Sequence, residues 1–185
     1  PWLASSWQLI IEGLDSKASP HAWCIVHPPG VPASELSDQL VRVLLCQDLV
    51  NDEPCGHCVS CRLRDAHPDL LTLAPEGAAG MIKVDAVRDA IEVSYTTASM
   101  GGCRVVLVRP ADCLNRASSN ALLKIVEEPP SGTIFVFQTA LPGKLPPTLV
   151  SRLRIVKVAV PSAELFAQKV QSLGITAQQV NLASA

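Results

Sequence analysis

The sequence lacks three features that would assign it to common functional classes: an excess of positive charge, a long apolar run and a secretory leader. Its 15 Lys and Arg face 17 Asp and Glu, so a net charge of −2 gives no general attraction to nucleic acid. No apolar run approaches the ~20 residues of a membrane-spanning helix, and no charged-then-apolar signal peptide opens the chain. We therefore expect a soluble, cytoplasmic protein with no membrane contact, whose DNA contacts are local or shared with a partner.

The composition favours a folded domain with a substantial core. Hydrophobic residues make up 48% of the 185 positions, and the mean hydropathy is +0.28. A chain of this length buries roughly 70% of the surface that it exposes when unfolded. One domain, or one domain and part of another, is expected, with a core that does not depend on a bound metal.

Four of the seven cysteines lie in one short stretch with the spacing C-x8-C-x2-C-x2-C. They are Cys46, Cys55, Cys58 and Cys61. Two residues between cysteines allow both sulfurs to turn onto one ion, and Gly56 permits the tight bend that this requires. Four thiolates with no open position form a closed tetrahedral site, so the spacing predicts structural zinc.

Other roles for cysteine and histidine remain open at this point. An odd cysteine count without a leader argues against disulfides. Cys24, Cys103 and Cys113 fall in apolar or helical contexts and are interpreted as ordinary buried thiols. His57 or His67 could replace one sulfur, although four cysteines already complete the coordination shell.

Hydrophobic periodicity predicts strands that alternate with helices. The expected strands are 21–27, 70–74, 104–108, 133–139 and 154–160. The expected helices are 2–14, 33–45, 84–100 and 118–128, the last capped by Ser118. This alternation indicates an α/β fold with a parallel sheet flanked by helices. We expect an α/β domain over 1–160, a zinc module inserted at about 46–66, and short helices at 162–173 and 176–183 that begin a helical lid domain over 161–185.

Several motifs together resemble one known family. They are Pro1-Trp2-Leu3, His21-Ala22, the four cysteines, His67-Pro68-Asp69, Val84-Asp85-Ala86-Val87-Arg88, Gly101-Gly102-Cys103-Arg104-Val105-Val106, Asn120-Ala121-Leu122-Leu123-Lys124-Ile125-Val126-Glu127-Glu128-Pro129-Pro130 and Ser151-Arg152. The set is similar to the bacterial DNA polymerase III clamp-loader ATPases, and within them to the delta-prime subunits. The resemblance implies an AAA+ (P-loop NTPase-like) fold.

The phosphate-binding loop of that family is degenerate in this sequence. ATP-hydrolysing members resemble Gly-x-x-Gly-x-Gly-Lys followed by Ser or Thr, in which backbone N–H groups and the lysine hold the phosphates. Here Ala33 stands at the lysine position and Pro32 replaces a glycine, so only Gly30 and Ser34 of the pattern remain. Pro32 also removes one N–H donor from the loop.

The acidic motif after the strand 104–108 is also missing. An ATPase of the family carries Asp-Glu there to hold magnesium and activate water, whereas this chain has Arg109-Pro110. Asp112 is interpreted as a surface carboxylate at a helix start, and Thr139, at the family's sensor position, as structural. The resemblance therefore implies no ATP, no Mg²⁺ and no ATP hydrolysis on this chain.

The resemblance retains one catalytic group, Arg152. In the family a Ser-Arg-Cys stretch supplies an arginine finger to the nucleotide on the neighbouring subunit, where a guanidinium stabilises phosphoryl charge. Here Leu153 stands where the family has cysteine. The alternative is a surface arginine that pairs with a carboxylate.

The family also implies a DNA contact at the start of the helix 118–128. The residues concerned are Ser118, Ser119 and Asn120, whose N–H groups would face phosphates of the primer–template. The alternative for this helix is a solvated face on which Lys124, Glu127 and Glu128 pair with one another.

These inferences together favour a non-catalytic subunit of the replicative clamp loader. It would complete the ATPase ring with the motor (tau/gamma) and delta subunits, supply Arg152, and help to load the sliding clamp on primed DNA. Two alternatives remain: an ATP-hydrolysing motor subunit of the same complex, and an autonomous zinc-dependent DNA-binding domain. The residues around the cysteines are mixed in sign, which argues against the second.

Overall fold

The structure is a computed structural model that describes residues 3–16, 19–31, 33–76 and 80–159 of the 185-residue chain. The lid domain expected over 161–185, with its two short helices, lies outside the described residues. Within the described part, no helix has the length and apolarity that crossing a membrane requires.

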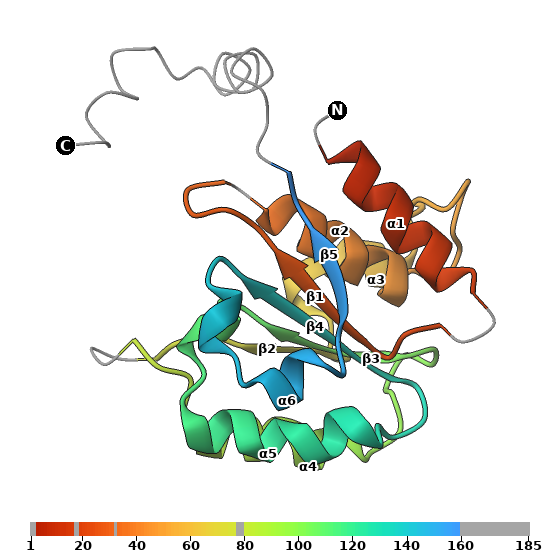
Figure 1. Cartoon of the computed structure of the whole chain (residues 1–185). Helices are drawn as coiled ribbons and strands as arrows, with labels where there is room; N and C mark the ends of the chain where they lie inside the picture. The colour runs from red at the N-terminus through yellow and green to blue at the C-terminus, as the bar shows by residue number, and fades with distance from the viewer. Residues whose placement is uncertain (1–2, 17–18, 32, 77–79, 160–185) are drawn as a thin grey trace, which may run out of the picture.

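A five-stranded parallel sheet forms the centre of the domain, as the sequence predicts (Figure 1). Its strands are β1 (Ala22–Val26), β2 (Leu70–Leu73), β3 (Arg104–Val108), β4 (Thr133–Thr139) and β5 (Arg154–Lys157). They lie in the order β2-β3-β4-β1-β5, and every pairing is parallel. The central strands are buried on both faces, which explains their continuous apolar sequences.

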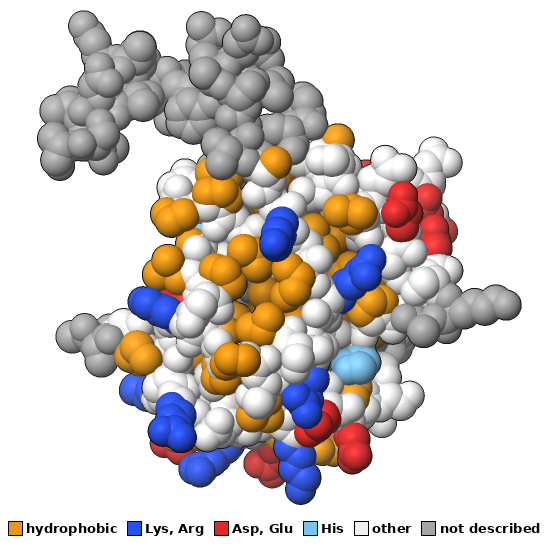
Figure 2. Space-filling model, in the orientation of Figure 1, with side chains coloured by type: hydrophobic (Ala, Val, Ile, Leu, Met, Phe, Trp, Pro, Cys, Tyr) orange, Lys and Arg blue, Asp and Glu red, His pale blue; other side chains and the backbone are white. Residues whose placement is uncertain are grey.

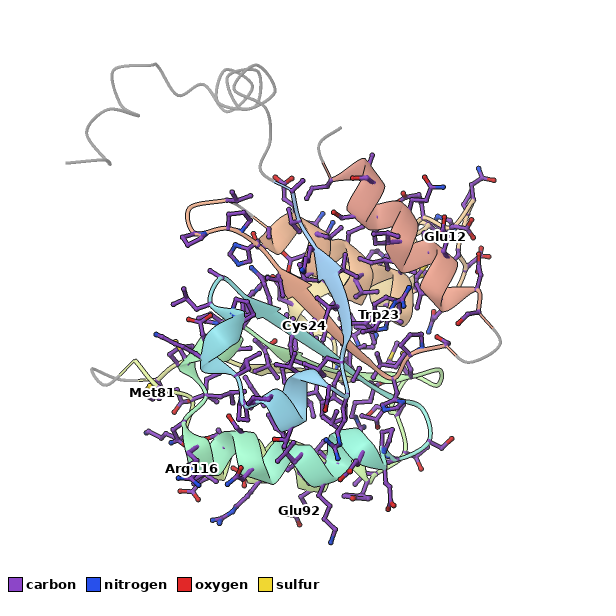
Figure 3. All side chains as sticks on the ribbon, in the orientation of Figure 1. Glu12, Trp23, Cys24, Met81, Glu92 and Arg116 are labelled. Atoms are coloured by element: carbon purple, nitrogen blue, oxygen red, sulfur yellow. The ribbon has the colours of Figure 1, made fainter. Side chains whose placement is uncertain are left out.

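Helices cover both faces of the sheet (Figure 1). On one face lie α1 (Ala4–Leu14) and α2 (Ser34–Leu45); on the other lie α4 (Val84–Ser94), α5 (Arg116–Glu127) and the short α6 (Pro147–Val150). Alternate strand residues belong to the two core layers: Trp23 lies in the same core cluster as Leu36 of α2, and Cys24 in the same cluster as Leu122 of α5. Figure 3 labels both strand residues. A further short helix, α3 (Val59–Leu63), belongs to the segment between α2 and β2.

Two predicted helix boundaries are wrong, for identifiable reasons. The helix predicted over 84–100 ends at Ser94, because the carbonyls of Thr96 and Thr97 turn to accept hydrogen bonds from Arg104. The helix predicted to start with a Ser118 cap begins at Arg116, and Asn115 caps it through a 2.8 Å bond from the Ser118 N–H to Asn115 Oδ1.

Three further details differ from the sequence prediction. The fifth strand ends at Lys157 rather than at residue 160. The helices α3 and α6 were not predicted, since five and four residues are too few to show a helical period. The remaining strands agree with their predicted positions to within one residue at each end.

The strand β5 forms one edge of the sheet and lies on the face of the molecule shown in Figure 2. On this face apolar side chains gather near the middle, with Lys and Arg side chains around them (Figure 2). The segment α6–β5, which contains Arg152, lies on the same side of the molecule as this surface.

The close packing of α1 on β1 yields a testable expectation at Gly13. A Cβ on Gly13 would lie 2.4 Å from Cη2 of Trp23, whose side chain is fully buried and has no room to move. We expect Gly13→Ala to lower the free energy of unfolding, because overpacking costs about 1–3 kcal/mol and exceeds a helix-propensity gain of about 1 kcal/mol. Urea unfolding of both proteins measures the difference.

Gly143→Ala provides the matched control. A Cβ there meets nothing within 4 Å, and Gly143 has no positive φ. The control should be neutral or slightly stabilising. Equal unfolding midpoints for Gly13→Ala and wild type would contradict the packing described here.

Candidate metal centre and degenerate nucleotide site

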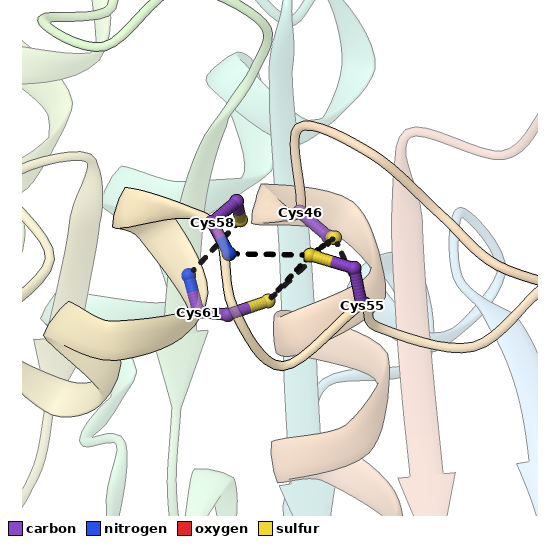
Figure 4. A group of neighbouring side chains, drawn as sticks. All are labelled: Cys46, Cys55, Cys58 and Cys61. Atoms are coloured by element: carbon purple, nitrogen blue, oxygen red, sulfur yellow. Dashed lines mark hydrogen bonds between the residues drawn. The ribbon is translucent and has the colours of Figure 1, made fainter.

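The four cysteines predicted to bind zinc converge on one point (Figure 4). Cys46 directly follows α2, Cys58 caps α3, and Cys61 lies within α3. The sulfur of Cys46 lies 3.7 Å from that of Cys55 and 3.6 Å from that of Cys61, and all four sulfurs lie within 4.8 Å of one another. A tetrahedron with Zn–S bonds of about 2.3 Å has sulfur–sulfur edges of about 3.8 Å, so the donor set fits tetrahedral zinc.

Backbone N–H groups point at the sulfurs and favour their thiolate forms. The N–H of Cys55 donates to Cys46 Sγ at 3.4 Å, that of Cys58 to Cys55 Sγ at 3.3 Å, and that of Cys61 to Cys58 Sγ at 3.4 Å. Backbone hydrogen bonds from Gln47 and Cys61 lower the pKa of Cys58 to about 6, whereas burial raises the pKa of Cys61 to about 12. Four thiols this close cannot all ionise without a cation between them, and a divalent metal would remove that conflict.

Neither histidine belongs to this group of donors. His57 is exposed, and its Nδ1 lies 2.9 Å from the Cys55 carbonyl oxygen. His67 is buried; its Nε2 lies 3.0 Å from Ser60 Oγ, and its Nδ1 accepts the Asp69 N–H. Among the residues that the structure describes, the candidate metal site consists of the four cysteines.

The other three cysteines lie outside the cluster. Burial raises the pKa of Cys24 to about 12 and that of Cys103 to about 11, which makes both thiols unreactive. Cys24 is buried as expected, whereas Cys103 and Cys113 are half-buried.

Metal removal should affect the cysteine module (residues 46–66) and leave the sheet folded. We expect one Zn²⁺ per chain and its loss in Cys46→Ser, with faster amide hydrogen exchange confined to the module, because the core packs without it. Metal analysis and hydrogen-exchange mass spectrometry measure both effects, and Cys113→Ser is the control that keeps its metal. Cooperative unfolding of the whole domain on chelation would contradict this expectation.

One N–H group of the loop at the predicted phosphate site is already bonded within the loop. Gly30 has a φ of +77° and permits the turn in which the Val31 N–H donates to the Pro28 carbonyl at 3.1 Å. Ala33, at the lysine position, is 1% exposed, so a methyl group is buried where a phosphate-binding cation would need to reach out. Ser34 begins α2.

Arg109 forms an ion pair beside this loop. Its Nη1 lies 2.5 Å from Asp38 Oδ1 of α2 and 3.4 Å from Ser37 Oγ. The buried Ser37 hydroxyl in turn donates to Gln138 Oε1 at 2.7 Å. These side chains bond to one another at the carboxyl ends of β3 and β4, where the family's acidic motif would hold a metal. The sequence alone does not predict this network.

Asp112 is not the free surface carboxylate that the sequence suggests. It is half-buried, and the fully buried Thr139 hydroxyl donates to its Oδ1 at 2.6 Å. The Leu141 N–H donates to Thr139 Oγ1 at 3.0 Å. The two side chains join the end of β4 to the turn after β3, a structural role for Thr139.

Arg152 lies between α6 and β5 and contacts the end of α5. Its Nη1 donates to the Thr148 carbonyl at 2.6 Å, and its Nη2 forms an ion pair with Glu127. Leu153, which replaces the family's cysteine, is 8% exposed and packs in the core. The Glu127 pair is the contact that the alternative interpretation expects, but a pair this exposed contributes roughly 1 kcal/mol or less and is easily exchanged.

The three predicted DNA-contact residues differ in accessibility. Ser118 and Ser119 are buried; the Ser118 N–H bonds Asn115, and its hydroxyl donates to the Ile82 carbonyl at 2.8 Å. Asn120 is exposed. A cavity of about 490 Å³ lies beside it, and Arg116 and Lys144 contribute the charged side chains of its lining. A phosphate at the start of α5 would therefore meet Asn120 and the two neighbouring cations rather than the N–H groups of the serines.

The structure also contains a buried ion pair, between Asp69 and Arg104, that the sequence analysis does not predict. Asp69, directly before β2, lies 3.1 Å from Arg104 Nη2, and both side chains are at least 96% buried. Asp69 also accepts the N–H groups of Ser99 and Met100 at 2.7 and 2.8 Å. A charged residue opening an otherwise apolar strand, as Arg104 does, is the sequence signal that could have revealed it.

Comparison with known proteins places this chain in one family. The family described as "DNA polymerase III, delta subunit" matches residues 3–162. The chain belongs to the DNA polymerase III delta subunit family. Within this family, DNA polymerase III subunit delta' of Escherichia coli K12 is 39% identical over all of this chain and 56% of its own length, and that of Pseudomonas aeruginosa is 38% identical over 82% of this chain and 46% of its own length. The chain thus spans about half the length of the curated relatives it matches.

Solved structures with the same fold support the AAA+ assignment. A DNA polymerase III gamma subunit-related protein of Thermotoga maritima has a TM-score of 0.62 at 21% identity, over 93% of this chain and 50% of that one. The RuvB Holliday junction branch migration motor of the same organism has a TM-score of 0.53 at 12% identity, over 93% and 50%. The AAA+ fold predicted from the sequence is confirmed, together with the family.

Proposed function

We propose that this chain is the N-terminal part of a cytoplasmic delta-prime subunit that does not hydrolyse ATP and completes the ring of a bacterial replicative clamp loader. The observation that carries the proposal is the filled nucleotide site: Ala33 is buried at the lysine position, and Arg109 pairs with Asp38 where acids would be needed. An arginine at the end of β3 repels Mg²⁺ and offers no base to activate water. Arg152 is retained, so the chain can act on a nucleotide held elsewhere.

The proposed role of Arg152 is to stabilise charge on a nucleotide bound by the neighbouring subunit. Its contact with the Thr148 carbonyl orients the guanidinium, and the exposed Glu127 pair can be exchanged for phosphoryl oxygens. Relatives named DNA polymerase III subunit tau and DNA polymerase III subunit gamma/tau are similar to this chain, and we assign the neighbour to that motor subunit. Delta, the sliding clamp and primed DNA complete the proposed set of partners.

Two further assignments belong to this proposal. The four cysteines would hold a structural Zn²⁺, which supplies cross-linking of the module and no catalytic step. Asn120, with Arg116 and Lys144 beside it, would contact primer–template phosphates in the assembled ring. Residues 1–160 would form the AAA+ domain, and 161–185 would begin the lid.

Nucleotide titration of the chain tests the non-hydrolysing assignment. We expect no heat of binding for ATP with Mg²⁺ in a calorimeter up to millimolar nucleotide, because the site offers neither the lysine nor the acids. A gamma/tau motor subunit, titrated under the same conditions, is the positive control. Micromolar binding by this chain would favour the ATP-hydrolysing motor instead.

A further inference from the structure

Two adjoining cavities lie between α2 and the cysteine module. Their volumes are about 390 Å³ and 160 Å³, and both are lined by Asp38, Arg42, Cys61 and Arg64. They therefore form one continuous depression, which we call the module cleft. Its lining comes from α2, from the cysteine module and, in the smaller cavity, from β2 and β3.

The lining of the smaller cavity is partly apolar. Val41 and Leu45 of α2 and Leu107 of β3 contribute to it, together with charged side chains. A cavity of about 150 Å³ accommodates a benzene-sized apolar group, so this part of the cleft can take one apolar side chain. The lining of the larger cavity is mostly polar.

Two arginines, Arg42 and Arg64, line both cavities. Arg42 and Arg64 are both exposed, and among the described residues neither forms an ion pair. The third arginine of the lining, Arg109, already pairs with Asp38. At these two residues an added carboxylate finds guanidinium groups that form no ion pair within the described part of the chain.

The backbone holds Arg64 in an unfavourable conformation. Its φ is +49° and its ψ is −122°, a region that residues with a Cβ rarely adopt. Arg64 follows α3 directly, and the turn places it in the lining of both cavities. Strained non-glycine residues cluster at binding sites, which favours a ligand at this position.

The remaining charges limit what the cleft can bind. Four carboxylates also line it: Glu35, Asp38, Glu53 and Asp65. A polyanion such as nucleic acid would be repelled by them, whereas a single carboxylate can lie against Arg42 and Arg64. The same module exposes Leu49, Val50 and Val59, which suits contact with a protein surface.

We infer that the module cleft binds a peptide segment of a partner protein that carries a carboxylate next to an apolar side chain. The carboxylate lies between Arg42 and Arg64, and the apolar side chain fills the cavity over Val41 and Leu107. The inference rests on the proposed function only for the choice of partner, which is a protein of the clamp loader.

Arginine-specific labelling tests this inference on the full-length subunit. Phenylglyoxal modification is measured by mass spectrometry for the subunit alone and in a complex reconstituted with its motor and delta partners. We expect labelling of Arg42 and Arg64 to fall at least fivefold in the complex, with Arg62 unchanged, since Arg62 is exposed on α3 outside the cleft lining. The double variant Arg42→Ala, Arg64→Gly should weaken assembly at least tenfold, and Arg62→Ala should not.

The outcomes separate this inference from the proposed function. Glycine tolerates the positive φ at residue 64, so the double variant should keep its metal. If the variant loses its metal, labelling of the wild-type subunit decides whether the module cleft is occupied in the complex. Unchanged labelling in a complex whose assembly is verified by sedimentation would overturn the module cleft and leave the proposed function intact. Protection that needs primed DNA would overturn it in favour of nucleic acid, and a wild-type subunit that does not assemble would overturn both.

Discussion

Replacement of Asp69 by alanine is expected to lower the free energy of unfolding by about 3–5 kcal/mol, the cost of breaking a buried ion pair by removing one partner. The change leaves the Arg104 guanidinium buried without a carboxylate, and the N–H groups of Ser99 and Met100 lose their acceptor. Arg104 also bonds the carbonyls of Val93, Thr96 and Thr97, so the loop after α4 loosens with it. Chemical unfolding of wild type and variant measures the difference.

An exposed ion pair supplies the matched control. Asp85 lies 3.3 Å from Arg88 on α4, with side chains 81% and 70% exposed. Asp85→Ala should cost less than about 1 kcal/mol, because solvent screens such a pair. Similar losses of unfolding free energy for Asp69→Ala and Asp85→Ala would contradict the larger contribution that we assign to the buried pair.

The same carboxylate predicts a pH dependence of stability. Burial acts to raise the pKa of Asp69, but hydrogen bonds from Ser99 and Met100 and the Arg104 charge outweigh burial and hold the pKa below its usual value. The stabilisation is therefore complete above pH ~4, the unfolded pKa, and disappears as the pH falls through the lower folded pKa. The difference in unfolding free energy between wild type and Asp69→Asn should shrink below pH ~4.

The sheet could be predicted from the sequence because buried parallel strands are continuous apolar runs. The run at 104–108 and the run at 133–139 match β3 and β4 residue for residue. Helix ends are less predictable, since Asn115 and Ser118 are both good caps. In the structure Asn115 caps α5, and the Ser118 hydroxyl bonds the Ile82 carbonyl instead. Local propensity carries no information about such tertiary contacts.

In the candidate sites, too, the features set by local sequence could be predicted and those set by tertiary contacts could not. The cysteine cluster could be predicted, because its ligands lie close in sequence and their spacing reflects the geometry of one ion. The partners of Arg109 and Arg152 could not, since they lie 71 and 25 residues away along the chain. Pairings of that kind depend on how α2 and α5 pack on the sheet, which periodicity does not specify.

Arg152→Ala should produce the largest functional effect. In the assembled loader the guanidinium would bind phosphoryl oxygens of the neighbour's nucleotide, and arginine fingers contribute about 10³–10⁵ in rate. Nucleotide sites of the ring that Arg152 does not contact would continue to hydrolyse ATP. We therefore expect a smaller loss for the whole loader, at least a tenfold fall in kcat for DNA-stimulated hydrolysis. Arg152→Lys should not restore the rate, because an ammonium lacks the planar pair of donors.

Arg154→Ala is the control for a general loss of positive charge. Arg154 is exposed at the start of β5, two residues from Arg152. Its replacement should leave hydrolysis within a factor of two. Equal losses in the two variants would assign the effect to the charge of this surface rather than to a finger.

Clamp- and DNA-stimulated ATP hydrolysis by a reconstituted loader tests the proposed arginine finger most directly. The loader contains the full-length subunit as wild type or Arg152→Ala, with assembly verified by sedimentation. A tenfold or greater loss of kcat in an intact complex is the predicted result. Unchanged hydrolysis in an intact complex would contradict the proposed role of Arg152. Arg152 would then be a surface arginine paired with Glu127, and the subunit would serve only as a scaffold.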